Sequence, residues 1–122
     1  MIRGIGTDIV EIDRISRAIK KDYFLKRAFS DSEIAMAKER NTDVFLAGNF
    51  AVKEAFVKAL GIGFRGIGLK DLEVLRDKYG KPFIRICNPE NIHLMDINEK
   101  NIYVSISNTN SLVVAMVVIE VD

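Results

Sequence analysis

The segment spanning residues 43–60 constrains the fold of this chain more than any other. Its apolar residues are spread around the whole circumference of a helix, which predicts a helix buried on most sides. Three charged residues, Lys53, Glu54 and Lys58, interrupt this apolar run. At about 100° per residue Lys53 points away from Lys58, so these charges do not form one solvent-facing stripe. Because charges on a buried helix need partners or a ligand, the segment predicts either structural ion pairs or a functional site.

The length and composition predict one ordered domain, residues 1–122. A chain of 122 residues is too short for two ordinary domains, and its 48% apolar and 29% charged residues are typical of a globular protein. The longest apolar run, 112–119, is far shorter than the roughly 20 residues of a membrane helix. One cysteine, Cys87, cannot form an internal disulfide. This fits a reducing cytoplasm, and the charged N-terminal residues do not form a signal peptide.

The periodicity predicts an α+β fold with helices packed on an antiparallel sheet. A short strand is expected at 2–5, followed by a bend at Gly4 and Gly6. Helices are expected from about residue 12, at 31–40 and at 43–60, and two hairpins pair 72–76 with 83–86 and 102–107 with 112–121.

Local signals set the expected helix ends. Ser30 and Glu33 form a capping box, Thr42 can cap the long helix, and Gly61 suits its C-terminal end.

Residues 112–119 are apolar at consecutive rather than alternate positions, so both faces of that strand should be covered. A domain of this size has few ways to cover both faces, which predicts a subunit interface.

Asp8 is a candidate metal ligand together with Glu54. Asp8 could instead cap the first helix, and Glu54 could form an ordinary helix ion pair with Lys58, four residues later. Two carboxylates without histidine or cysteine ligands suit a hard cation, best Mg²⁺, which keeps several waters and binds substrate phosphates.

Residues 61–68 contain a literal GxGxxG, but they follow a helix and lead toward a strand, so they are no dinucleotide fingerprint. This loop could let backbone amides approach a phosphate near Lys58, or it could be only a helix end and a flexible connection.

Residues 14–27 carry six positive charges against one negative. Arg14, Arg17 and Lys21 are expected on one helical face, which is either a solvated surface or a docking surface for an acidic partner. A nucleic-acid partner is less supported, because few aromatics interleave with these charges.

Four segments together resemble the holo-acyl-carrier-protein synthases, the small bacterial type of phosphopantetheinyl transferase. The matches at 4–15 and 45–59 are specific, whereas those at 80–82 and 103–109 are weak alone. The resemblance runs over essentially the whole chain. It implies a homotrimer with the phosphopantetheinyl-transferase-like fold and active sites between subunits, acting in the cytoplasm in fatty acid biosynthesis.

The resemblance also implies roles for individual residues. Asp8 and Glu54 would bind Mg²⁺, and Lys58 would face the coenzyme A phosphates. Arg14 matches a basic residue of the helix that would dock an acidic acyl carrier protein, and Arg17 and Lys21 are expected on the same helical face. The coenzyme would contact five further residues: Gly61, Gly63, Ser107, Asn108 and Thr109.

Two positions depart from the family pattern, since Asn49 stands where arginine is usual and Asn108 where histidine is usual. Asparagine can donate a hydrogen bond but cannot titrate, so a histidine base at position 108 is excluded.

The implied reaction is attack of a carrier serine on the β-phosphorus of coenzyme A, which releases 3′,5′-ADP. The sequence leaves open whether Glu54 or a metal-bound water takes the serine proton. It also leaves two alternatives, a carrier-binding homologue that has lost catalysis and a structural trimer without a ligand.

Overall fold

The computed structural model describes residues 1–122 as two antiparallel sheets arranged around one long helix. The larger sheet has the strand order β1-β5-β4, and its strands are β1 (Ile2–Glu11), β4 (Ile102–Asn108) and β5 (Leu112–Glu120). The second sheet is the hairpin of β2 (Leu72–Arg76) and β3 (Pro82–Ile86). Both predicted hairpins and the α+β class are therefore confirmed.

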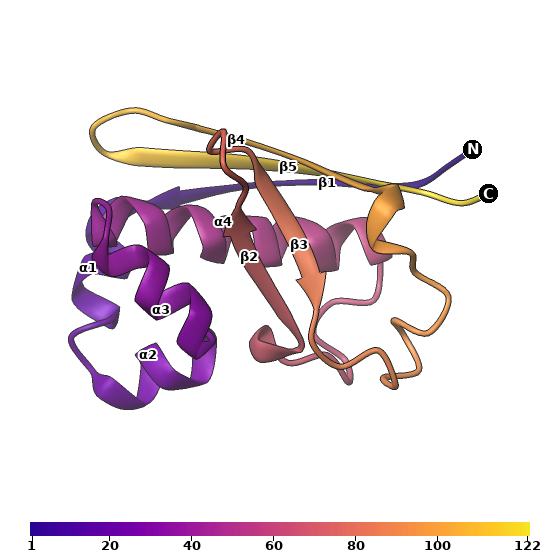
Figure 1. The fold of residues 1–122 in the computed structure, drawn as a ribbon, viewed down its shortest axis with the longest axis horizontal. Helices are drawn as coiled ribbons and strands as arrows, with labels where there is room; N and C mark the ends of the chain where they lie inside the picture. Colours follow the sequence, from indigo (N-terminus) through magenta and orange to yellow (C-terminus); the bar gives the residue numbers. More distant parts are fainter.

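The helices divide between the N-terminal region and the face of the larger sheet. They are α1 (Ile12–Ala18), α2 (Asp22–Ala28), α3 (Asp31–Lys38) and α4 (Thr42–Leu60), and two 3₁₀ turns occupy Leu69–Asp71 and Glu99–Asn101. Helix α4 runs along one face of the β1-β5-β4 sheet, while α1, α2 and α3 gather near its N-terminal end (Figure 1). No helix combines the length and apolarity needed to cross a membrane.

The predicted burial of α4 is confirmed, and it separates the three charges of this helix. Lys53 is fully buried, and its Nζ donates to Glu33 Oε1 at 2.7 Å and to the carbonyl of Ala28 at 2.8 Å. Burial lowers the pKa of Lys53, and the Glu33 carboxylate opposes that shift. Lys53 is thus a structural charge, whereas Glu54 stays half-buried and Lys58 exposed.

The predicted bend at Gly4 and Gly6 is wrong, because both glycines lie inside a strand that continues to Glu11. A Cβ at Gly4 would lie 1.9 Å from the carbonyl oxygen of Ala59, and one at Gly6 would lie 1.9 Å from that of Ala55. The glycines therefore let β1 approach the backbone of α4 more closely than any side chain would allow.

The helix ends follow the local signals with one exception. The Ser30–Glu33 capping box is present, and Gly61 ends α4 with φ of 78°. The N-cap of α4 is Asn41, whose Oδ1 accepts from the backbone N–H of Val44. Thr42, predicted as this cap, instead donates its hydroxyl to the carbonyl of Ala37, because it already lies within the first turn.

The outer face of the larger sheet is covered by no helix or strand of this chain (Figure 1). Along β5, residues facing α4 are buried, but Val114 and Met116 on the outer face are 42% and 40% exposed. Ile5 and Ile9 on β1 expose 56% and 61% of their surface beside them. The chain alone therefore covers one face of β5, and the apolar outer face stays open.

Candidate functional site

Asp8, Lys58 and Glu54 meet where β1 crosses the C-terminal half of α4. Lys58 Nζ lies 3.1 Å from Asp8 Oδ1 and donates to the backbone carbonyl of Thr7 at 3.0 Å. The Asp8 side chain is only 15% exposed, whereas that of Lys58 is 57% exposed. Lys58 thus pairs across the two elements, and Glu54 joins none of the five ion pairs of the structure.

The charge environment of Glu54 reflects its closeness to Asp8. Burial, and then the charge of Asp8, raise the pKa of Glu54, while Lys58 and Arg14 oppose this shift. Two carboxylates that sense each other across a partly desolvated gap favour a shared cation. No group of three or more histidine, cysteine, aspartate or glutamate side chains is placed to hold a metal. A two-carboxylate site fits Mg²⁺, which commonly takes its other ligands from water and phosphate.

A hollow of about 460 Å³ opens beside Glu54, walled by the loop that follows α4. Its lining residues are Arg27, Glu54, Phe64, Ile67, Gly68, Leu69, Lys70 and Asp71. Gly61 and Gly63, predicted to contact the coenzyme, lie on the same loop but outside this lining. The loop leads from a helix through a 3₁₀ turn into β2, so the GxGxxG is indeed no dinucleotide fingerprint.

Among the other predicted coenzyme residues, Ser107 and Asn108 end β4, Thr109 follows in the turn, and strand β5 separates them from Asp8 on β1. Thr109 Oγ1 accepts hydrogen bonds from the backbone N–H groups of Ser111 and Leu112, which fixes the turn of the hairpin. Asn108 lines a second hollow, of about 300 Å³.

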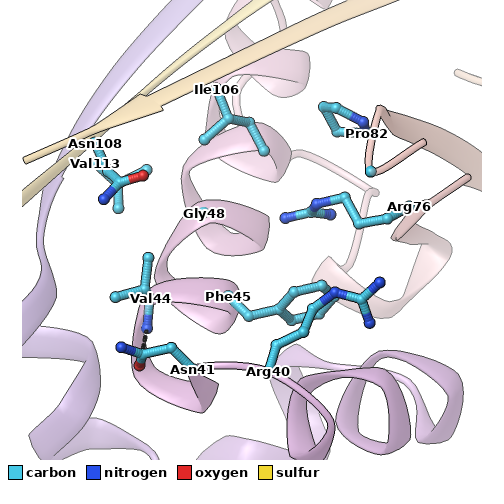
Figure 2. A pocket seen from close by; sticks show the side chains of 11 residues that line it. Arg40, Asn41, Val44, Phe45, Gly48, Arg76, Pro82, Ile106, Asn108 and Val113 are labelled. Atoms are coloured by element: carbon cyan, nitrogen blue, oxygen red, sulfur yellow. Dashed lines mark hydrogen bonds between the residues drawn. The ribbon is translucent and has the colours of Figure 1, made fainter. Parts of the chain in front are cut away.

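Two arginines that sequence reasoning missed dominate this second hollow, called here the Arg40–Arg76 pocket (Figure 2). Its lining residues are Arg40, Asn41, Val44, Phe45, Gly48, Arg76, Gly80, Pro82, Ile106, Asn108 and Val113. The family resemblance at residues 80–82 could have indicated this pocket, because Gly80 and Pro82 line it. No sequence feature indicated Arg76.

The Asp8 cluster and the Arg40–Arg76 pocket lie on different sides of α4. Phe45, in the pocket, and Glu54, in the cluster, are separated by about half a turn around the helix and about 13 Å along its axis. The structure thus gathers Asp8, Glu54 and Lys58 at one place and puts Asn108 at another.

The predicted basic face of the first helix is only partly formed. The Cζ atom of Arg14 lies 5.9 Å from the centre of the Phe50 ring, and the Arg14 charge is close enough to Glu54 to affect the pKa of Glu54. Arg17 lies in the last turn of α1, which ends at Ala18. Lys21 adopts an extended conformation as the N-cap of α2, so the prediction that it shares a helical face with Arg14 and Arg17 is wrong.

Comparisons with known proteins agree over nearly the whole chain. The family model of the 4′-phosphopantetheinyl transferase superfamily matches residues 4–117. The holo-[acyl-carrier-protein] synthase of Clostridium botulinum (strain Eklund 17B / Type B) is 50% identical over 123 residues, which cover 99% of both chains. The chain belongs to the holo-[acyl-carrier-protein] synthases. Another synthase of this family, from Halothermothrix orenii, is 45% identical over 97% of both chains.

Solved synthase structures share the fold. The Bacillus anthracis synthase, crystallised in complex with CoA (3′,5′-ADP), has a TM-score of 0.83 at 34% identity and is matched over 100% of this chain and 99% of its own. The Helicobacter pylori synthase in complex with coenzyme A has a TM-score of 0.82 at 34% identity, over 95% of this chain and 99% of its own. These matches confirm the predicted family, enzyme class and fold.

Proposed function

We propose that this holo-[acyl-carrier-protein] synthase transfers phosphopantetheine from coenzyme A to a serine of apo-acyl carrier protein at the Asp8–Glu54–Lys58 cluster. The observation that carries the proposal is the convergence of these three side chains where Gly4 and Gly6 bring β1 against α4. Burial and the nearby Asp8 carboxylate raise the pKa of Glu54, and Glu54 joins no ion pair that would offset this.

Asp8 and Glu54 are the residues that would hold Mg²⁺. When bound, the ion would neutralise charge on the phosphate oxygens of the coenzyme. Lys58 Nζ forms a salt bridge with Asp8 Oδ1 in this structure, but the exposed and flexible Lys58 side chain can turn toward a phosphate.

The chain's own contribution is mainly positioning and charge stabilisation, as is usual for phosphoryl transfer. The serine hydroxyl attacks the β-phosphorus of coenzyme A, the bond to the 3′,5′-ADP oxygen breaks, and Lys58 stabilises the negative charge of the leaving group. Glu54 or a water molecule accepts the serine proton. Asn108 cannot take it, because an amide does not titrate.

We further propose that the enzyme is a homotrimer whose sites are completed by a neighbouring subunit. The exposed apolar face formed by Ile5, Ile9, Val114 and Met116 supports an interface, because patches of this kind mark association surfaces. The separation of the Asp8 cluster from the Arg40–Arg76 pocket supports it as well. If one chain held the whole coenzyme A molecule, its diphosphate would lie at Lys58 and its nucleotide in the Arg40–Arg76 pocket. The molecule would then have to reach across α4.

The acidic carrier protein would dock on α1 through Arg14 and Arg17. The position of Arg14 near Glu54 supports this, since a carrier held there would present its serine close to the cluster.

The test is substitution of the two carboxylates, measured as phosphopantetheine gain by intact mass spectrometry of the carrier. Asp8→Ala and Glu54→Ala should each slow Mg²⁺-dependent transfer by about 10³-fold or more, because several kcal/mol of charge stabilisation would be lost. Asp13→Ala, an exposed aspartate in the first turn of α1, is the matched control and should keep full activity. Normal turnover by a folded Asp8→Ala or Glu54→Ala protein would refute the assignment.

A further inference from the structure

The Lys58 ammonium is bound to one of the two carboxylates that we assign to the metal. Lys58 Nζ lies 3.1 Å from Asp8 Oδ1 and donates to the backbone carbonyl of Thr7 at 3.0 Å. Glu54 lies one turn earlier on α4, at the spacing of a helix ion pair, yet Lys58 pairs with Asp8 instead. Two contacts with adjacent residues of β1 therefore hold the ammonium against a carboxylate that the cation needs.

The surroundings of this pair make it stronger than an ordinary surface ion pair. A salt bridge between two fully exposed side chains contributes little. The Asp8 side chain is only 15% exposed, because Gly4 and Gly6 let β1 lie directly against the backbone of α4. Attraction between opposite charges increases where water is partly excluded. The Asp8 carboxylate is therefore not freely available to a cation from solution.

The charges of the cluster nearly cancel when no ligand is bound. Asp8 and Glu54 supply two negative charges, Lys58 places a positive charge at Asp8, and the charge of Arg14 acts on Glu54. A divalent cation that arrives alone would have to displace the ammonium from Asp8 and would then be repelled by it. The enzyme by itself should therefore bind the cation weakly.

A phosphate group changes this balance. The diphosphate of coenzyme A carries negative charge that attracts the Lys58 ammonium, and the exposed, flexible Lys58 side chain can follow it. Asp8 Oδ1 then loses its partner, and the phosphate oxygens add ligands of the kind that Mg²⁺ prefers. The ligand that supplies the remaining oxygens also releases the carboxylate.

We infer that Lys58 couples the two ligands by blocking Asp8 in the coenzyme-free enzyme, so that the divalent cation binds tightly only together with coenzyme A. This inference rests on the proposed function and adds a regulatory role to Lys58. Coupling between two ligands is reciprocal, so the cation raises the affinity for coenzyme A by the same factor. The enzyme without coenzyme A then stays metal-poor at cation concentrations that saturate the complex.

The experiment measures Mn²⁺ binding with and without coenzyme A, in the absence of carrier protein so that no transfer occurs. Mn²⁺ accepts the oxygen ligands that suit Mg²⁺, and its paramagnetic resonance signal counts the free ion. A titration of coenzyme A without enzyme corrects for Mn²⁺ bound in solution. Saturating coenzyme A should tighten Mn²⁺ binding to the unchanged enzyme by about 10- to 100-fold, a range usual for coupled sites.

Lys58→Met should uncouple the two ligands. Without the ammonium, Mn²⁺ alone should bind about tenfold more tightly than it binds to the unchanged enzyme. The further tightening by coenzyme A should be smaller than in the unchanged enzyme by at least about threefold. Lys58→Arg should keep the binding of Mn²⁺ alone weak, because a guanidinium also pairs with a carboxylate. The Lys58 side chain is 57% exposed, so both variants should fold.

Arg14→Met is the matched control, since it removes a positive charge near Glu54 and leaves the Lys58–Asp8 pair intact. It should change the binding of Mn²⁺ alone by less than about threefold. Equal affinity of Lys58→Met and the unchanged enzyme for Mn²⁺ alone would overturn the inference. Equal gains in Lys58→Met and Arg14→Met would overturn it too, because net charge rather than the occupied carboxylate would then set the affinity.

A further outcome concerns the proposed function itself. Absence of Mn²⁺ binding to the unchanged enzyme and to Lys58→Met, with coenzyme A present, would refute the metal site at Asp8 and Glu54 and the inference with it. Tight Mn²⁺ binding to the unchanged enzyme without coenzyme A would leave that metal site standing and refute only the coupling.

Discussion

Glu54 lies half-buried beside Asp8, and the neighbouring Lys58 is engaged with Asp8. The raised pKa of Glu54 means that the Glu54 carboxylate binds a proton more readily in the folded, metal-free protein than in the unfolded chain. The ionised form therefore opposes folding. This penalty is absent at low pH, where Glu54 is protonated in both states, and it grows as the pH rises from the unfolded pKa through the raised folded one. A side chain placed for a ligand would be expected to carry such a cost.

Glu54→Gln should consequently stabilise the protein while abolishing its metal-dependent activity. With a chelator present at pH 7, the thermal midpoint of Glu54→Gln should lie modestly above that of the unchanged enzyme, because the amide carries no charge. At about pH 4 the two midpoints should converge, since Glu54 is then largely protonated. A variant less stable than the parent at pH 7 would contradict this electrostatic account.

The sequence pattern alone could not separate the roles of Lys53 and Lys58. Both interrupt the same apolar run, and helical spacing shows only that they point in different directions. Their roles depend on Glu33 and Asp8, which are distant in sequence and are brought to α4 by α3 and β1. The position of Arg76 could not be predicted for the same reason. It is set by a hydrogen bond from Arg76 on β2 to Asn49 on α4.

At the scale of elements, the contact between β1 and α4 decides where the site forms. Gly4 and Gly6 face Ala59 and Ala55, and these small residues, spaced two apart on the strand and four apart on the helix, lie in register. Glycine suggests a bend when a strand is considered alone, which is why the sequence-based prediction ended β1 too early. Close backbone approach becomes evident only when the opposing alanines are known. The capping signals at Ser30 and Gly61 succeeded because each depends on a few adjacent residues.

Gly6→Ala should both destabilise the protein and disturb the site. The new Cβ would clash with the backbone carbonyl of Ala55, which cannot move without distorting α4, so the free energy of unfolding should fall by about 3 kcal/mol. Because β1 carries Asp8, phosphopantetheine transfer should fall as well.

Gly68→Ala is the matched control for stability, since a Cβ there meets nothing within 4 Å and its φ of −96° suits any residue. Its free energy of unfolding should stay within about 0.5 kcal/mol of the parent in urea titration. Equal stability of Gly6→Ala and Gly68→Ala would show that β1 does not depend on this close contact.

At the scale of the whole molecule, the Asp8 cluster and the Arg40–Arg76 pocket lie apart, and one apolar face is uncovered. The apolar pattern of residues 112–119 predicts that both faces of β5 are covered. Within one chain, only the face toward α4 is buried. Burial by a second copy would complete that pattern. It would also let the Asp8 cluster of one subunit meet the Arg40–Arg76 pocket of another, a division that no single-chain pattern could reveal. We therefore propose that each active site is shared between two copies of the chain.

The most direct test of this claim mixes two inactive variants with lesions in different half-sites. Asp8→Ala removes a carboxylate of the cluster. Val44→Glu places a negative charge in the Arg40–Arg76 pocket, in the first turn of α4 where an acidic residue favours the helix. Each variant alone should fail to transfer phosphopantetheine. Mixed oligomers formed by co-expression should recover about a quarter of the parental sites, because a random pair of neighbours combines two intact halves with that frequency.

The control mixes Asp8→Ala with Glu54→Ala, whose lesions share one half-site, and it should recover no activity. The decisive measurement is thus the phosphopantetheine gain of apo-acyl carrier protein, followed by intact mass spectrometry, with the Asp8→Ala and Val44→Glu mixture. Recovery near a quarter of the parental rate is the result that the shared site predicts. No recovery, in oligomers that native mass spectrometry confirms to contain both variants, would place the whole site within one chain and contradict this account.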